Sequence, residues 1–128
     1  MKNEVVFDAS VLLAILQQER GVGRALEVAE RAVISAVNLA EVQTKLVEKG
    51  NDTRVALQLI QSTDCTSIPF EDIQAAVAGS LVAVTRRYGL SLGDRACLAL
   101  ALVRKAPVYT TDRVWSQLDL DLKVEVIR

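Results

Sequence analysis

Four acidic side chains occupy similar places in the sequence, close to junctions between a predicted strand and the helix that follows it. Asp8 ends the first predicted strand, in the segment EVVFDAS, and Asp112 ends the segment PVYTTD. Glu41 lies in the early turns of one predicted helix, and Asp94 opens another. The carboxyl ends of parallel strands share one edge of a sheet, so we expect these acids to converge there.

Clustered carboxylates repel one another unless a cation lies among them. Two such charges about 5 Å apart repel by roughly 3 kcal/mol at an effective dielectric constant near 20. The chain contains no histidine, which removes the usual general base and the usual zinc ligand. A set of oxygen ligands without histidine or thiolate suits Mg²⁺ or Mn²⁺. The acids therefore predict a site for a divalent metal ion.

Each acid also has a structural interpretation as a helix cap or as part of an ion pair. The possible caps are Asp8 or Ser10 for the first helix, Asp94 with Ser91 in capping-box spacing, and Asp112 for the segment RVWSQL. Glu41 and Lys45 have the i,i+4 spacing of an ion pair. Capping is the commoner explanation for any one aspartate, whereas convergence of the whole set favours the metal. Glu71 and Asp72 are expected at the same edge, so spacing alone does not decide which acids meet.

Strands and helices alternate along the chain. Segments rich in Val, Ile or Tyr predict strands at residues 4–8, 32–35, 66–70, 107–112 and 123–127. Between them, helical patterns cover residues 11–19, 23–32, 38–50, 53–62, 71–89 and 93–105. This order predicts crossover units and an α/β fold with a mainly parallel sheet. The stretch 97–103 is apolar on every side, so its helix should lie against the middle of the sheet.

Composition limits the class of protein. With 128 residues and 51% hydrophobic content, we expect residues 1–128 to form one domain without a disulfide. Cys65 and Cys97 lack CxxC spacing and are predicted to be buried apolar side chains. The start of the chain has no secretory pattern, and its apolar stretches are too short to cross a bilayer, which predicts a cytoplasmic protein. The net charge of −1 and five aromatic residues argue against a uniformly basic or base-stacking nucleic-acid binder.

Four segments together resemble the PIN-domain nucleases and, among them, the VapC-like toxins of toxin–antitoxin pairs. The segments are VVFDAS, SAVNLAEV, LSLGDRACLALA and PVYTTDRVW, which occur in the expected order and cover nearly the whole chain. The resemblance implies a three-layer α/β/α sandwich whose central, mainly parallel sheet has about four to five strands. It also implies a Mg²⁺- or Mn²⁺-dependent endoribonuclease with Asp8, Glu41, Asp94 and the more variable Asp112 as catalytic, metal-binding residues.

Further residues and partners follow from the same resemblance. Ser10 and Thr110 match positions that line or support the site, and Asn38 is interpreted as a helix-start residue. Arg95 and Arg113 stand beside proposed ligands and are candidates for contacts with RNA phosphates. The family implies RNA as substrate, with structured or tRNA-like targets, a cognate antitoxin protein and a toxin homodimer.

Other interpretations fit less well. A dinucleotide-binding domain needs GxGxxG after the first strand, but GVGRAL follows a helix and has Leu26 in place of the third glycine. A haloacid-dehalogenase-type phosphatase would have a second aspartate where the chain has DAS. A phosphoacceptor receiver domain is the main alternative, although its phosphorylated aspartate ends the third strand, where this chain has IPF. A stand-alone PIN nuclease without a toxin role, or a DNA structure-specific nuclease, also remains open.

Overall fold

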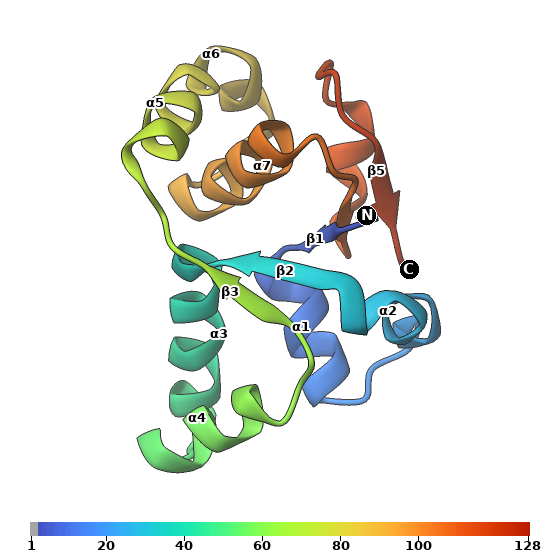
Figure 1. The fold of residues 1–128 in the computed structure, drawn as a ribbon, viewed down its shortest axis with the longest axis vertical. Coiled ribbons are helices and arrows are strands. Elements are labelled where there is room, and N and C mark those ends of the chain that lie inside the picture. The colour runs from blue at the N-terminus through green and yellow to red at the C-terminus, as the bar shows by residue number, and fades with distance from the viewer. Residues whose placement is uncertain (1–2) are drawn as a thin grey trace.

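The predicted strands form a single parallel sheet in a computed structural model that describes residues 3–128 (Figure 1). Within this range the strands are β1 (Val5–Phe7), β2 (Ala32–Ser35), β3 (Thr66–Ile68), β4 (Val108–Thr110) and β5 (Val124–Val126). Their order across the sheet is β3-β2-β1-β4-β5, and each neighbouring pair is parallel. The predicted parallel sheet of four to five strands is therefore confirmed.

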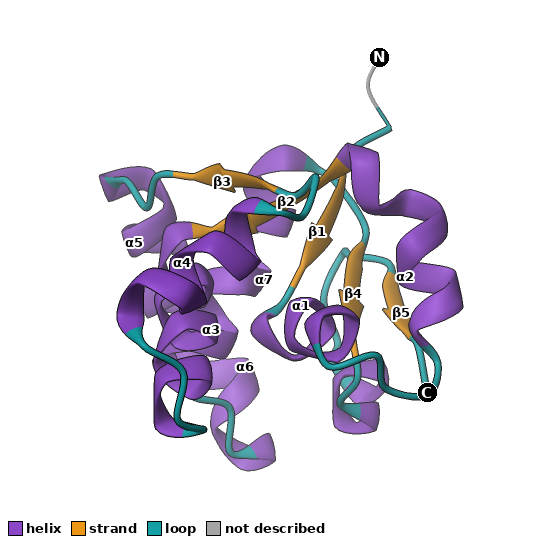
Figure 2. Ribbon diagram, turned by 90° about the horizontal axis from the view of Figure 1, so that it is seen from below, coloured by secondary structure: helices purple, strands orange, loops and turns teal. Residues whose placement is uncertain are grey.

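Helices cover both faces of this sheet, which gives the predicted three layers (Figures 1 and 2). One face carries α1 (Ala9–Leu16), α2 (Val22–Val28), α3 (Ala36–Glu48) and α4 (Thr53–Gln61). The other carries α5 (Asp72–Ser80), α6 (Val82–Thr85) and α7 (Leu92–Arg104). Successive strand residues point to opposite faces, so Val6 packs in the cluster that includes α7, while Val5 and Phe7 pack in a cluster with α1 and α2.

Helix α7 is the main core helix on its face. Residues 96–101 are all buried, and this helix contacts β1, β2 and β4 in the middle of the sheet. Its apolar pattern on every side predicted this position correctly, because a helix that packs against both a sheet and other helices exposes little surface. Cys97 is among its buried residues, and Cys65 is partly buried; both thiols are free. Within residues 3–128, no helix is long and apolar enough to cross a membrane.

The predicted single helix over residues 71–89 is divided, which corrects the sequence interpretation. It consists of α5, α6 and a short 3-10 helix, η2 (Arg86–Tyr88). The Ser80 hydroxyl donates a 2.8 Å hydrogen bond to the Val77 carbonyl, and the Thr85 hydroxyl donates one of the same length to the Leu81 carbonyl. Such side-chain bonds compete with the helical backbone pattern and bend helices.

The strand order also decides between two α/β alternatives. A receiver domain has the order 2-1-3-4-5, whereas this chain places β2 between β1 and β3. The receiver-domain alternative is therefore wrong for this chain. The order reverses direction between β1 and β4, so the crevice at their carboxyl ends is the topological switch point of the sheet.

Candidate active site

The carboxyl ends of β1 and β4 meet at the switch point, where open α/β sheets usually bind ligands. Asp8 follows β1 directly, and Thr110 is the last residue of β4. The buried Thr110 hydroxyl donates a hydrogen bond of 2.7 Å to Asp8 Oδ2. In turn, Thr110 Oγ1 accepts a 3.0 Å bond from the backbone N–H of Asp112. One side-chain contact therefore links the ends of the two strands and the start of the following segment.

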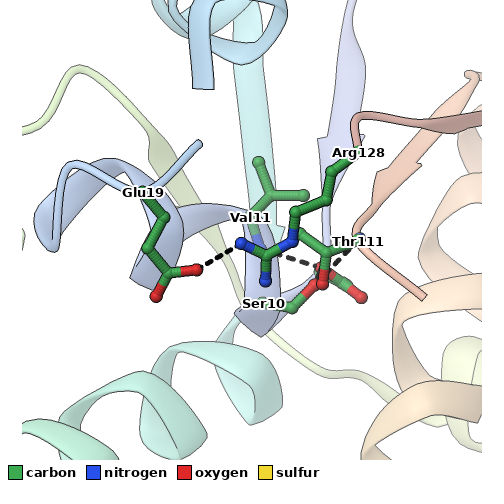
Figure 3. Close-up of polar contacts among 6 residues, drawn as sticks. Ser10, Val11, Glu19, Thr111 and Arg128 are labelled. Carbon is green, nitrogen blue, oxygen red and sulfur yellow. Dashed lines mark hydrogen bonds and ion pairs between the residues drawn. The ribbon is translucent and has the colours of Figure 1, made fainter. Parts of the chain in front are cut away.

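Ser10 supports the other oxygen of Asp8. Its hydroxyl donates a 2.6 Å hydrogen bond to Asp8 Oδ1, and the same oxygen accepts a 3.0 Å bond from the Val11 N–H. Ser10 Oγ also accepts a bond from the Thr111 N–H at 3.1 Å. Figure 3 shows Ser10, Val11 and Thr111 together, with the ion pair between Arg128 and Glu19 beside them. Asp8 is thus the N-cap of α1, with both carboxylate oxygens engaged.

Burial dominates the acidity of Asp8, a residue that is only 6% exposed. The pKa of Asp8 is raised from its ordinary value of 3.8 to about 6, and burial is the largest cause. Hydrogen bonds from Ser10, Thr110 and Val11 lower the pKa and offset part of this effect, while the negative charge of Asp94 raises it. Ionised Asp8 is therefore held at an energetic cost, which a nearby cation would reduce.

The four predicted acids line one pocket of about 340 Å³. Asp8 lies at the end of β1, Glu41 in the second turn of α3, Asp94 in the first turn of α7, and Asp112 just after β4. Three of these carboxylates also act on the buried thiol of Cys97. Burial raises the pKa of Cys97 well above its ordinary value, and the charges of Asp8, Asp94 and Glu41 raise it further. All four acids that the sequence analysis singled out thus line this one pocket at the carboxyl edge of the sheet.

The same aspartates also cap helices, so the two interpretations hold together. Asp94 Oδ2 accepts a 2.9 Å bond from the Ser91 N–H, while Ser91 Oγ accepts one of 3.1 Å from the Asp94 N–H, which completes the capping box of α7. Asp112 Oδ1 accepts a 3.0 Å bond from the Val114 N–H and caps the 3-10 helix η3 (Arg113–Gln117). Each cap uses one carboxylate oxygen and leaves the other available.

Oxygen atoms remain for a metal ion in this pocket. Within residues 3–128, Asp94 Oδ1, Asp112 Oδ2 and Glu41 Oε2 accept no hydrogen bond, whereas Glu41 Oε1 accepts one from Asn38. Across the same residues, no three acidic, histidine or cysteine side chains lie close enough to form a ready metal cluster. The donor set nevertheless fits Mg²⁺ or Mn²⁺, because hard cations prefer oxygen ligands and Mg²⁺ commonly retains several waters beside one or two carboxylates.

The basic residues are arranged differently from the sequence interpretation. Lys45 lines the pocket, and its Nζ lies 3.9 Å from Glu48 Oε1, so the ion pair suggested between Lys45 and Glu41 is replaced by a loose one with Glu48. Arg95 is half-buried and donates a 2.9 Å hydrogen bond to the Ala78 carbonyl of α5. Arg113 donates a 3.4 Å bond to the carbonyl of Arg128. Neither arginine is among the residues that line the pocket.

Two acids that spacing alone left as candidates lie away from the pocket, and two residues at the pocket were not predicted from the sequence. Glu71 and Asp72, which spacing alone left as possible members of the set, line another depression with Ile73. Lys45 was missed as a pocket residue because a lysine at i+4 from a glutamate predicts an ion pair first. Gly93 was also missed, although it lies directly against Glu41. Its only sequence signal was a glycine inside a helix start, where glycine is unfavourable.

Comparisons with known proteins identify the family and agree with the fold. The sequence matches the model of the PIN domain family over residues 5–120. Similar solved structures include VapC20 of Mycobacterium tuberculosis, described as a sarcin-ricin loop cleaving toxin, with 16% identity, a TM-score of 0.73, and coverage of 94% of this chain and 99% of that one. DNA-bound VapBC of Salmonella typhimurium has 18% identity and a TM-score of 0.74, with 98% of each chain covered. VapBC-5 of Mycobacterium tuberculosis has 28% identity and a TM-score of 0.68, also with 98% of each chain covered. A search of curated protein sequences gave no significant match.

The raised pKa of Asp8 predicts a specific dependence of stability on pH in the presence of chelator. The folded state binds the Asp8 proton more tightly than the unfolded state, so this contribution to stability is fully present below pH 3.8 and is lost as the pH rises through about 6. The full difference corresponds to about 3 kcal/mol. Asp8→Asn has no carboxyl group at this position, so we expect its stability not to show this decrease as the pH rises. Its free energy of unfolding, relative to the parent, should therefore rise by up to about 3 kcal/mol between pH 4 and pH 7 in urea titrations. If the difference in free energy of unfolding between the variant and the parent is constant across that range, the pKa of Asp8 is not raised by burial.

Proposed function

The chain belongs to the PIN domain family, and from this premise we propose that it is a Mg²⁺- or Mn²⁺-dependent endoribonuclease that cleaves phosphodiester bonds of RNA. The observation that carries the proposal is the pocket at the switch point, which brings together Asp8, Glu41, Asp94 and Asp112. Structured RNA is the proposed substrate class, with support from the similar VapC20 structure, which is described as cleaving the sarcin-ricin loop. Residues 1–128 would act as a single nuclease domain.

The acids have distinct proposed roles. Asp8, Glu41 and Asp94 would hold the cation, directly or through water, and Asp112 would complete the ligand set or orient the attacking water. When bound, the cation positions and acidifies this water and stabilises the charge on the leaving oxygen. Ser10 and Thr110 would keep the Asp8 carboxylate ionised and fixed through their hydrogen bonds. Since the chain has no histidine, protonation of the leaving 3′ oxygen would fall to solvent.

An acidic pocket must also admit a polyanion, and Lys45 is the residue to which we assign this task. Its side chain is 62% exposed at the pocket, and its contact with Glu48 is long. An exposed ion pair of this kind is weak, so the ammonium group is free to contact an RNA phosphate. This role replaces the one suggested for Arg95 and Arg113, which are held by backbone carbonyls outside the pocket.

We further propose that the enzyme is the toxin of a toxin–antitoxin pair. The support is the likeness in fold to the toxin-containing VapBC assemblies, which extends over nearly the whole of both chains. A cognate antitoxin would inhibit the enzyme, and the toxin would form a homodimer. Such an enzyme would act in the cytoplasm, where RNA and a co-expressed antitoxin are present.

Cleavage of labelled, structured RNAs tests the enzymatic proposal. The parent is expected to cut them with Mg²⁺ or Mn²⁺ and to be inactive in chelator. Asp8→Asn and Asp94→Asn should each lower the rate on the order of 100-fold or more, because each removes a charged ligand from the proposed site.

Asp119→Asn provides a control with the same change in charge. Asp119 is exposed and is not among the residues that line the acidic pocket, so this variant should cleave like the parent. If the parent and Asp8→Asn cleave equally well, or if chelator does not affect the parent, the proposed metal-dependent mechanism is wrong.

The role of Lys45 predicts an effect on RNA binding that depends on salt. Lys45→Gln should weaken the affinity for a single-stranded RNA roughly fivefold at low salt and reduce the slope of log K against log salt by about 0.7. Lys49→Gln changes the charge of the same helical region outside the pocket lining and is the matched control. Fluorescence anisotropy with Asp8→Asn as the common background measures binding without cleavage. Equal effects of the two lysine variants would show that Lys45 has no special contact.

A further inference from the structure

The carboxylate of Glu41 lies directly against the first turn of α7, at Gly93. A Cβ atom at Gly93 would lie 2.3 Å from Glu41 Oε2, 2.7 Å from Cδ and 2.8 Å from Oε1. These distances are shorter than real contacts of a Cβ atom, so the carboxylate occupies the space that any other side chain at this position would need. Gly93 lies inside a helix, where alanine is the more favourable residue. A side chain at position 93 would require the Glu41 carboxylate to move, which is a reason for glycine here that the helix itself does not give.

Asn38 holds the same carboxylate from the other side. It lies one turn before Glu41 on α3 and is only 1% exposed. Its Nδ2 donates a 2.8 Å hydrogen bond to Glu41 Oε1 and a 2.9 Å hydrogen bond to the Gly93 carbonyl. Asn38 lies in the first turn of α3, as the helix-start interpretation expects, while Ser35 is the residue that caps the helix. The amide therefore joins α3 to α7 at the point where Glu41 enters the pocket.

The other atom of the Asn38 amide strengthens this interpretation. Asn38 Oδ1 is buried, and no group within residues 3–128 donates a hydrogen bond to it. A buried acceptor without a partner destabilises a protein, so an apolar side chain would serve better if this position only filled space. An apolar residue could not donate the two hydrogen bonds that Asn38 donates to Glu41 and to the Gly93 carbonyl.

We propose that Asn38 and Gly93 form a seat for the Glu41 carboxylate and are positioning residues for the acidic pocket. Gly93 supplies the space, and Asn38 supplies the hydrogen bond that keeps a long, flexible side chain in one orientation. Fixing the carboxylate before a ligand arrives removes the entropic cost of ordering it at that moment. The role of the seat in metal binding rests on the proposed function, because it takes Glu41 as a ligand.

The first measurement tests the seat without metal. In chelator, NMR is expected to show the Asn38 side-chain amide protons shifted by hydrogen bonding and protected from exchange with solvent. Gly93→Ala should displace Glu41, so the proton directed at Glu41 should exchange faster and change its shift. Gly79→Ala is the matched control, because Gly79 also lies in a helix and a Cβ there would have no neighbouring atom within 4 Å. If both variants leave the Asn38 protons as in the parent, the seat does not exist.

The second measurement tests what the seat does, with Mn²⁺ as the probe. Calorimetric titration should give an affinity roughly tenfold weaker for Gly93→Ala and for Asn38→Ala, whereas Gly79→Ala should match the parent. One variant adds volume and the other removes a donor, so a shared loss points to their common partner. In a Glu41→Gln background, adding Gly93→Ala should change the Mn²⁺ affinity no further, because the residue through which it acts has lost its charge.

The two measurements separate failure of the seat from failure of the proposed function. An unchanged Mn²⁺ affinity in Gly93→Ala and Asn38→Ala, with normal binding by the parent, would overturn the positioning role. An equal loss in the Glu41→Gln background would also overturn it, because the effect would then not act through Glu41. If the parent binds no Mn²⁺ while the NMR signals respond as expected, the metal-dependent function is wrong and the seat for Glu41 stands.

Discussion

The buried carboxylate of Asp8 is the group on which the arrangement of the pocket depends. Its two oxygens accept hydrogen bonds from the Ser10 hydroxyl, the Val11 N–H and the Thr110 hydroxyl. Ser10 and Thr110 then accept backbone bonds from Thr111 and Asp112. This network joins the end of β1, the start of α1 and the end of β4 at the switch point. Burying a charge is unfavourable unless hydrogen bonds compensate for it, so each of these partners stabilises both the fold and the ionised acid.

Helix capping explains how the chain tolerates several acids in one place. Asp8, Asp94 and Asp112 each accept a backbone N–H bond at the start of a helical segment, where the helix dipole favours negative charge. These local interactions oppose the mutual repulsion of the carboxylates even without a cation. Capping and ligand binding are therefore compatible at Asp94 and Asp112, where the cap occupies one of the two carboxylate oxygens, whereas both oxygens of Asp8 already accept hydrogen bonds.

The sequence was most informative where local rules set the geometry. The five strands followed from short runs rich in Val and Ile, and the convergence of Asp8 and Asp112 followed from the shared edge of parallel strands. Arg95 could not be placed in this way, because the rotation of α7 about its axis depends on packing against α5, and this rotation directs the guanidinium to Ala78. The role of Gly93 could not be predicted either, because the side chain that it contacts, Glu41, belongs to α3 and lies 52 residues earlier in the sequence.

The difference between Glu41 and the aspartates explains why only the former needs a seat from a second helix. An aspartate at the N-cap or in the first turn of a helix is short, and backbone N–H groups at the start of its own helix fix its carboxylate. Glu41 lies six residues beyond the end of β2 and has a longer side chain with more rotatable bonds, so no N–H of its own helix is available to hold it. Asn38 and Gly93 provide the missing constraint at the junction of α3 and α7. The precision of the pocket thus depends on the packing of these two helices as well as on the strand ends.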